Sequence, residues 1–109
     1  MTRVLFLCGK ARQRSPTAAD VAMGFDGVEA DFAGLSADAD ELVSAEQIDW
    51  ADVIAVMERR QVKRLKQQFG TRLKAQRVVC LDVPDRYAFG DPALVSLLEG
   101  KLRRVLTRA

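Results

Sequence analysis

The chain has 109 residues, of which 49% are hydrophobic and 29% are charged, and its 17 Lys and Arg nearly balance its 15 Asp and Glu. This length supports one small hydrophobic core, so we expect a single domain over residues 1–109. The sequence contains no histidine, which excludes a Ser-His-Asp triad, a histidine general base and histidine metal ligands. No apolar stretch approaches the roughly 20 residues that a membrane-spanning helix needs, so no membrane association is predicted.

The two cysteines, Cys8 and Cys80, bear on the cellular compartment. Two cysteines argue against a disulfide framework and favour a reducing environment. The N-terminus also lacks the layout of a signal peptide, because Lys10, Arg12 and Arg14 interrupt the early apolar run. We therefore expect a cytoplasmic protein.

Hydrophobic periodicity divides the chain into alternating strands and helices. In chain order these are a strand at 3–7, a helix at 16–25, a strand at 27–32, a helix at 44–50, a strand at 52–57, a helix at 59–69, a strand at 77–81 and a helix from 92 onwards. Three helices are predicted to begin at residues typical of N-caps, namely Ser15, Ser44 and Asp91. Pro16 and Pro92 would then occupy the first helical positions.

Strands separated by helices predict a three-layer α/β fold, a parallel sheet with helices on both faces. Right-handed crossovers bring the carboxyl ends of all the strands to one edge of this sheet. Cys8, Met57 and residues 82–85 follow three of the predicted strands. We therefore expect them to meet at this edge, although they are far apart in sequence.

Charge is unevenly distributed along the chain. Residues 25–52 contain nine acids and no Lys or Arg, whereas residues 53–81 contain eight bases and a single acid, Glu58. The basic run at 59–66 is compatible with a nucleic-acid surface. Apolar side chains at helical spacing within it, and the lack of interleaved aromatic side chains for base stacking, instead favour the solvated face of an amphipathic helix.

The segment from Cys8 to Ser15 (Cys-Gly-Lys-Ala-Arg-Gln-Arg-Ser) places a thiol and an arginine between the first strand and the first helix. Such a loop presents backbone N–H groups and the positive end of the helix dipole to an anion. A cysteine in this setting is expected to be a thiolate near neutral pH. Arg14 can bind two phosphate oxygens at once. The segment therefore predicts phosphoryl transfer through a cysteinyl-phosphate, with Cys8 as the nucleophile.

Two further side-chain types would complete this chemistry. Ser15 can donate a hydrogen bond to the Cys8 sulfur, although an N-cap role alone explains the serine equally well. Because the chain has no histidine, the proton for the leaving group must come from a carboxylic acid. Asp82, Asp85 and Asp91 all follow the fourth predicted strand, and each is a candidate for this acid.

The order of a cysteine, five residues and Arg-Ser-Pro, directly after the first strand, resembles the signature of the low-molecular-weight protein tyrosine phosphatases. Residues 50–57 are similar to the third strand of that family. Residues 83–87 (Val-Pro-Asp-Arg-Tyr) resemble a variant of its Asp-Pro-Tyr acid loop. The resemblance covers most of the chain, with shortened connections as in a compact member. It implies a four-stranded sheet in the order 2-1-3-4 and Asp85 as the general acid.

Three positions depart from the pattern of that family. Lys10-Ala11 stands where the loop usually has Gly-Asn, and this asparagine normally braces the loop. Gln13 stands where a second cysteine is common, and Arg86 replaces the proline of the acid loop. None of these changes removes the nucleophile, the arginine or the candidate acid.

We therefore predict a protein tyrosine phosphatase that hydrolyses phosphotyrosine in a phosphorylated protein or another aryl phosphomonoester. The residues expected to bind the substrate are Gly9, Lys10, Ala11, Arg12, Gln13 and Tyr87. The loop amides and Arg14 supply the positive charge that a metal ion would otherwise give, so neither a metal nor a cofactor is expected.

Three alternatives use the same loop. The chain could be a phosphate- or phosphoprotein-binding module that has lost turnover, as the Lys10-Ala11 departure allows. An arsenate reductase of the same fold usually needs two further thiols, and only Cys80 remains. A phosphocysteine carrier of sugar transport would not need Arg14. Phosphate release from an aryl phosphate distinguishes the enzyme from the binding module.

Overall fold

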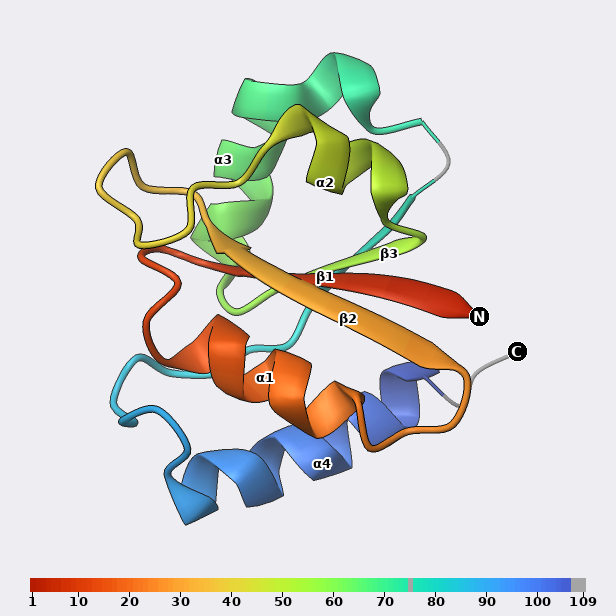
Figure 1. The fold of residues 1–109 in the computed structure, drawn as a ribbon. Coiled ribbons are helices and arrows are strands. Elements are labelled where there is room, and N and C mark those ends of the chain that lie inside the picture. The colour runs from red at the N-terminus through yellow and green to blue at the C-terminus, as the bar shows by residue number, and fades with distance from the viewer. Residues whose placement is uncertain (75, 107–109) are drawn as a thin grey trace.

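The computed structural model describes residues 1–74 and 76–106 (Figure 1). Four parallel strands form one sheet in the predicted order, β2-β1-β3-β4. The strands are β1 (Thr2–Cys8), β2 (Val28–Gly34), β3 (Val53–Val56) and β4 (Arg77–Cys80). The helices are α1 (Arg14–Ala22), α2 (Ala45–Trp50), α3 (Arg59–Phe69) and α4 (Pro92–Leu106), and a short 3₁₀ turn follows α3 at Gly70–Arg72.

Helices cover both faces of the sheet, which confirms the predicted three-layer fold (Figure 1). Successive side chains of a strand point to opposite faces. Val4 and Phe6 of β1 accordingly belong to the core cluster shared with α1 and α4, whereas Leu5 and Leu7 belong to the cluster shared with α2 and α3. Among the described helices, none has the length and apolar content needed to cross a membrane.

The predicted starts of α2 and α4 are confirmed by their capping contacts. Ser44 Oγ accepts a hydrogen bond from the N–H of Gln47 at 3.1 Å. Asp91 Oδ1 accepts one from the N–H of Ala93 at 2.9 Å. Each contact satisfies a backbone donor that has no partner within its helix, so these two residues fix where the helices begin.

The predicted N-cap of α1 is wrong, because the helix begins one residue before Ser15, at Arg14. The Ser15 hydroxyl is directed elsewhere, with Oγ 3.1 Å from the Cys8 sulfur and 3.4 Å from the carbonyl oxygen of Ala33. Pro16 is consequently the third helical residue and not the first. Its missing N–H costs nothing there, since the first turn of a helix leaves its N–H groups unpaired.

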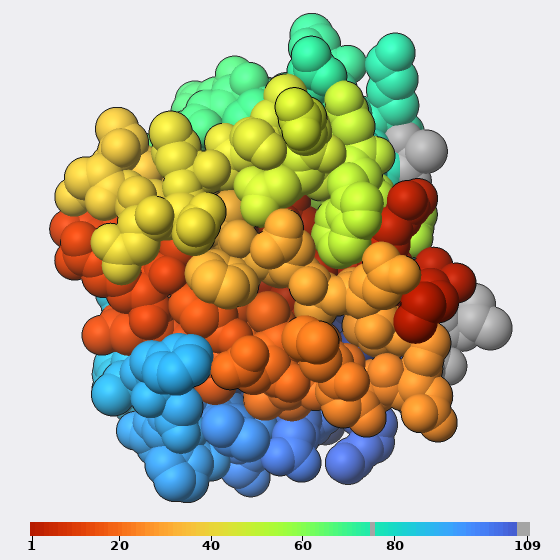
Figure 2. Space-filling model, in the orientation of Figure 1, coloured from red at the N-terminus to blue at the C-terminus, as the bar shows by residue number. Residues whose placement is uncertain are grey.

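Three connections gather at the carboxyl ends of the strands, on the left in Figure 1. The Cys8 loop (residues 8–14) follows β1, the 34–43 segment follows β2, and the Asp85 loop (residues 82–90) follows β4. Figure 2 shows the 34–43 segment, in yellow, against the red-orange Cys8 loop at the surface. This edge of the sheet therefore assembles residues that are distant in sequence.

Candidate active site

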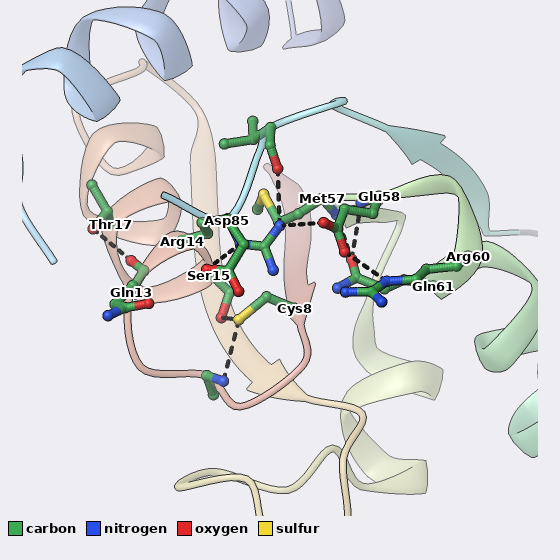
Figure 3. Close-up of polar contacts among 12 residues, drawn as sticks. Cys8, Gln13, Arg14, Ser15, Thr17, Met57, Glu58, Arg60, Gln61 and Asp85 are labelled. Atoms are coloured by element: carbon green, nitrogen blue, oxygen red, sulfur yellow. Dashed lines mark hydrogen bonds and ion pairs between the residues drawn. The ribbon is translucent and has the colours of Figure 1, made fainter. Parts of the chain in front are cut away.

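Cys8 is buried at the end of β1 and lines a cavity of about 280 Å³. Its sulfur lies 3.1 Å from Ser15 Oγ and accepts a hydrogen bond from the N–H of Ala11 at 3.2 Å (Figure 3). Hydrogen-bond donors at this distance stabilise negative charge on sulfur, so the geometry suits a thiolate. The lining residues are Cys8, Gly9, Lys10, Arg12, Gln13, Arg14, Ser36, Arg60, Gln61 and Asp85.

The backbone of the Cys8 loop leaves donor groups available to an anion. Three of its carbonyl groups accept hydrogen bonds from amides of the 34–43 segment: Cys8 from Leu35 at 3.0 Å, Gly9 from Ser36 at 2.9 Å and Lys10 from Asp40 at 3.0 Å. Five of its amides donate to no acceptor in residues 1–74 and 76–106: Gly9, Lys10, Arg12, Gln13 and Arg14. Unpaired amides next to the start of a helix form an anion-binding concavity.

Two ion pairs add to the contact between the Cys8 loop and the 34–43 segment. Lys10 Nζ lies 3.2 Å from Asp38 Oδ2, and Arg12 Nε lies 3.1 Å from Asp40 Oδ2. The hydrogen bond and the charge of Lys10 lower the pKa of Asp38 below its ordinary value of 3.8. Exposed pairs are individually weak. Together with the three backbone hydrogen bonds, however, they brace a loop that has Ala11 in place of the family's asparagine.

Two residues have an unusual backbone or unusually close neighbours where the Cys8 loop meets the 34–43 segment. Ala11 has a φ of 60°, in the left-handed region that costs a residue with a Cβ about 1–2 kcal/mol. Gly34 ends β2 so near the loop that an added Cβ would lie 2.7 Å from the carbonyl oxygen of Gly9 and 2.5 Å from the Cβ of Ala39. The sequence analysis missed Gly34, because no local pattern marks a contact between segments distant in sequence.

Arg14 is only 4% exposed, and its guanidinium lies between two carboxylates (Figure 3). Nη1 donates to the carbonyl oxygen of Val83 at 2.9 Å and lies 3.3 Å from Glu58 Oε1. Nε lies 3.7 Å from Asp85 Oδ1. In the described residues, Nη2 donates no hydrogen bond. Nη1 thus holds the side chain in place, and the N–H groups of Nη2 can donate to a ligand in the cavity.

Glu58 is a site residue that the sequence analysis missed. It follows β3 at the same sheet edge, and Gln61 of α3 fixes this junction. Gln61 Oε1 accepts hydrogen bonds from the N–H of Met57 at 2.9 Å and from that of Glu58 at 3.0 Å. Two signals could have identified Glu58: its place directly after a predicted strand, and its isolation as the single acid of a basic region.

The three candidate acids have different surroundings. Asp85 lines the cavity and contacts Arg14. Asp91 caps α4. Asp82 Oδ1 accepts a hydrogen bond from the Cys80 thiol at 3.4 Å and lies 3.9 Å from Arg59 Nε. Of the three, only Asp85 is among the residues that line the cavity.

Two residues predicted to bind substrate are not among those that line the cavity. Tyr87 packs against the core cluster of α1 and α4, with the guanidinium carbon of Arg86 5.5 Å from its ring centroid. Ala11 is buried and contributes its N–H to Cys8. Tyr87 therefore packs on the core and is not part of the lining of this cavity.

Cys80 lies on β4, and it too is absent from the lining of the cavity. Burial raises the pKa of its thiol, so a smaller fraction of Cys80 than of an ordinary cysteine is present as the reactive thiolate. In the described part of the chain, no group of three or more His, Cys, Asp or Glu side chains could hold a metal ion.

Comparison with known proteins identifies the fold to which this structure is similar. No protein-family model matches the sequence, and no curated protein matches it. Solved structures do match. The YwlE arginine phosphatase from Geobacillus stearothermophilus shares 22% identity at a TM-score of 0.75, with 96% of this chain and 90% of that chain covered.

Two further matches have a TM-score of 0.80. SP-PTP, a low molecular weight protein tyrosine phosphatase from Streptococcus pyogenes, shares 18% identity over 99% of this chain and 93% of that chain. Wzb from Vibrio vulnificus, solved in complex with benzylphosphonate, shares 17% identity over 99% of both chains. The predicted resemblance is thus confirmed in the fold, which is that of the low-molecular-weight protein tyrosine phosphatases.

Proposed function

We propose that this chain is a cysteine-dependent phosphatase that hydrolyses aryl phosphomonoesters, phosphotyrosine in proteins among them. The observation that carries the proposal is the grouping of Cys8, Arg14 and Asp85 around one cavity. The nucleophile, the oxyanion ligand and the proton donor of one reaction therefore come from two segments of the chain, the Cys8 loop and the Asp85 loop. The unpaired amides of the Cys8 loop support the same conclusion.

In the first step, the Cys8 thiolate attacks phosphorus while the bond from phosphorus to the ester oxygen breaks. Asp85, as a carboxylic acid, gives its proton to the departing oxygen. The loop amides and the free edge of Arg14 bind the phosphoryl oxygens and stabilise the charge of the transition state. The products of this step are the alcohol or phenol and a cysteinyl-phosphate.

In the second step, water attacks the cysteinyl-phosphate and the bond from sulfur to phosphorus breaks. The Asp85 carboxylate takes the proton of this water, which restores the acid. The Ser15 hydroxyl, 3.1 Å from the sulfur, donates a hydrogen bond to the thiolate as it leaves. Inorganic phosphate is released, and no metal takes part in either step.

The charges around the cavity favour an aryl phosphate over a phosphoguanidine. The bases Lys10, Arg12, Arg14 and Arg60 line the cavity, whereas Asp85 is the one acid in that lining. A phosphoarginine leaving group carries a positive charge, and Asp85, the one lining carboxylate that could pair with it, already contacts Arg14. A neutral phenyl ring needs no such partner. The benzylphosphonate in complex with Wzb is also an anion attached to an aromatic group, though it is a ligand of that protein.

Phosphate release tests the proposal directly. The chain would be assayed with phenyl phosphate, a phosphotyrosine peptide and phosphoarginine, each with and without a chelator. We expect chelator-insensitive hydrolysis of the two aryl substrates. The Cys8→Ser substitution should lower the rate by about a thousandfold or more, because it removes the nucleophile.

The matched control is Cys80→Ser, which should keep most of the activity because Cys80 is not among the cavity-lining residues. Wild-type rates with Cys8→Ser would reject the covalent mechanism. Hydrolysis of phosphoarginine but of neither aryl substrate would show that the substrates are phosphoguanidines and not aryl phosphates. Binding of phosphate without hydrolysis of any substrate would support the phosphate-binding module instead.

A further inference from the structure

A second hollow adjoins the cavity that contains Cys8. Its volume is about 560 Å³, and it extends along α3. Arg60 and Gln61 line both hollows, and Figure 3 shows them on the Glu58 side of Arg14. The complete lining of the second hollow is Gly9, Leu35, Ser36, Arg60, Gln61, Lys63, Arg64 and Gln67.

The bases around the two hollows differ in their pairing. Those of the Cys8 loop have carboxylate partners in the 34–43 segment. Arg60 has one as well, with Nε 2.9 Å from Glu58 Oε2. Lys63 and Arg64, both exposed, form neither an ion pair nor a side-chain hydrogen bond with any described residue. The second hollow therefore carries two positive charges that the fold does not neutralise.

These side chains lie along one face of α3. Arg60, Lys63, Arg64 and Gln67 have the helical spacing i, i+3, i+4 and i+7. At 1.5 Å per residue the row rises about 10 Å along the helix axis. That length corresponds to about three residues of extended chain. The row suits a peptide that continues from a group held in the cavity better than it suits a small phosphoester.

We propose that this face of α3 binds an acidic segment beside the phosphorylated residue of a protein substrate. The inference rests on the proposed function and specifies its substrate class. Carboxylates of the substrate pair with Lys63 and Arg64 in the second hollow, while the phosphoryl group occupies the cavity of Cys8. The basic run on α3 then acts as a specificity surface.

Two phosphotyrosine peptides that differ only in their flanks test this surface. One has Glu on both sides of the phosphotyrosine, and the other has Gln at the same positions. We expect kcat/KM to be about five- to tenfold higher for the Glu peptide at low ionic strength. In about 1 M salt the screening length falls to about 3 Å, so this preference should largely disappear.

Two double variants show which residues cause the preference for the Glu peptide. The Lys63→Gln/Arg64→Gln variant should reduce the preference for the Glu peptide to less than about twofold. The Lys66→Gln/Lys74→Gln variant removes the same charge from residues that do not line the hollow, and it should keep the preference. A preference that both variants lose equally would show that net charge alone is responsible, and would overturn the docking face.

Further outcomes separate this inference from the proposed function. Equal kcat/KM for the two peptides overturns the docking face and leaves the phosphatase intact. If neither peptide is hydrolysed, fluorescence anisotropy with Cys8→Ser decides: tighter binding of the Glu peptide supports the docking face alone, and equal binding rejects both proposals. A single-stranded oligonucleotide that displaces the Glu peptide at equal concentration would assign the face to nucleic acid instead.

Discussion

At the scale of single residues, the side chain of Arg14 shows how the fold prepares a binding group. A buried guanidinium is costly unless its charge is compensated. Glu58 and the Val83 carbonyl oxygen provide that compensation through Nη1, and Asp85 contacts Nε more loosely. An arriving phosphoryl group can therefore replace the looser contact without displacing the one that fixes the side chain.

The choice of Asp85 as the acid leads to a prediction about leaving groups. A proton donor matters most when the departing oxygen is a poor leaving group. Asp85→Asn should therefore slow hydrolysis of phenyl phosphate about a hundredfold but that of nitrophenyl phosphate far less. Steady-state rates with the two esters measure this difference.

Asp91→Asn is the matched control for that comparison. Asparagine is as good an N-cap as aspartate, so α4 should keep its start and the enzyme most of its activity. A leaving-group effect in Asp91→Asn, or in Asp82→Asn, but not in Asp85→Asn would move the proton donor to that other carboxylate.

The left-handed backbone of Ala11 leads to a prediction about stability. Glycine adopts a φ near 60° without the Cβ penalty, so Ala11→Gly should raise the free energy of unfolding by about 1 kcal/mol. Ala93→Gly, at an exposed position of α4, should lower it by about 0.5–1 kcal/mol. Denaturant unfolding measures both values. Destabilisation of similar size in both variants would mean that Ala11 is unstrained.

At the scale of elements, the end of β2 shapes the site although it contributes no reacting group. Gly34 is the point where this strand meets the Cys8 loop, and the 34–43 segment then accompanies the loop through backbone hydrogen bonds. The loop and the segment after β2 therefore form one structural unit. The conformation of the anion-binding backbone in the Cys8 loop depends on both segments.

Gly34→Ala tests this dependence. The added Cβ would overlap the carbonyl oxygen of Gly9 and the side chain of Ala39. Overpacking of this kind typically costs about 1–3 kcal/mol. We expect a loss of stability in that range together with a fall in kcat/KM, because the backbone of the Cys8 loop must shift. Gly100→Ala, where an added Cβ meets nothing within 4 Å, should instead stabilise α4.

A second variant distinguishes the two contacts of Gly34. Gly34→Ala/Ala39→Gly removes the side-chain overlap but leaves the overlap with the backbone of Gly9. It should recover only part of the lost stability and little of the lost activity. Full recovery of activity would mean that the approach of β2 to the Cys8 loop has no effect on the site.

At the scale of the whole molecule, hydrophobic periodicity was sufficient to predict the strands, the α-helices and the layered sheet of the described residues, but not the 3₁₀ turn at Gly70–Arg72. The predicted strand ends also placed Cys8, Met57 and residues 82–85 at one edge, whereas the choice of Asp85 among the three aspartates came from the family resemblance. The cap of α1 was wrongly predicted, since a tertiary contact to sulfur took the Ser15 hydroxyl. The roles of Gly34 and Glu58 depend on contacts across the fold, which local patterns do not encode.

Acid should destabilise the folded chain through two lowered carboxylate pKa values. Lys10 lowers the pKa of Asp38, and the backbone N–H of Arg3 lowers the pKa of Asp52. A group with a lowered pKa binds fewer protons in the folded state, so its stabilisation is present above the ordinary value of 3.8 and is lost as pH falls through the folded value. The midpoint temperature of thermal unfolding should therefore fall when the pH is lowered below about 4.

Substitutions by Asn test whether Asp38 and Asp52 cause this loss of stability in acid. Asp38→Asn and Asp52→Asn should each make the unfolding midpoint less sensitive to acid. Asp26→Asn is the control, because Asp26 is exposed and forms no ion pair with any described residue. An acid response that is unchanged in the first two variants would exclude these carboxylates as its source.

The hydrogen bonding of the Cys8 loop and of the Asp85 loop implies different rates of opening. Amides of the 34–43 segment are bonded to the Cys8 loop, whereas none from Asp85 to Phe89 donates a hydrogen bond within the described residues. In deuterium exchange, Leu35, Ser36 and Asp40 should be protected well beyond residues 85–89. One side of the cavity then keeps its shape while the other samples many conformations. Leaving groups of different sizes can be admitted without loosening the hold on the phosphoryl group.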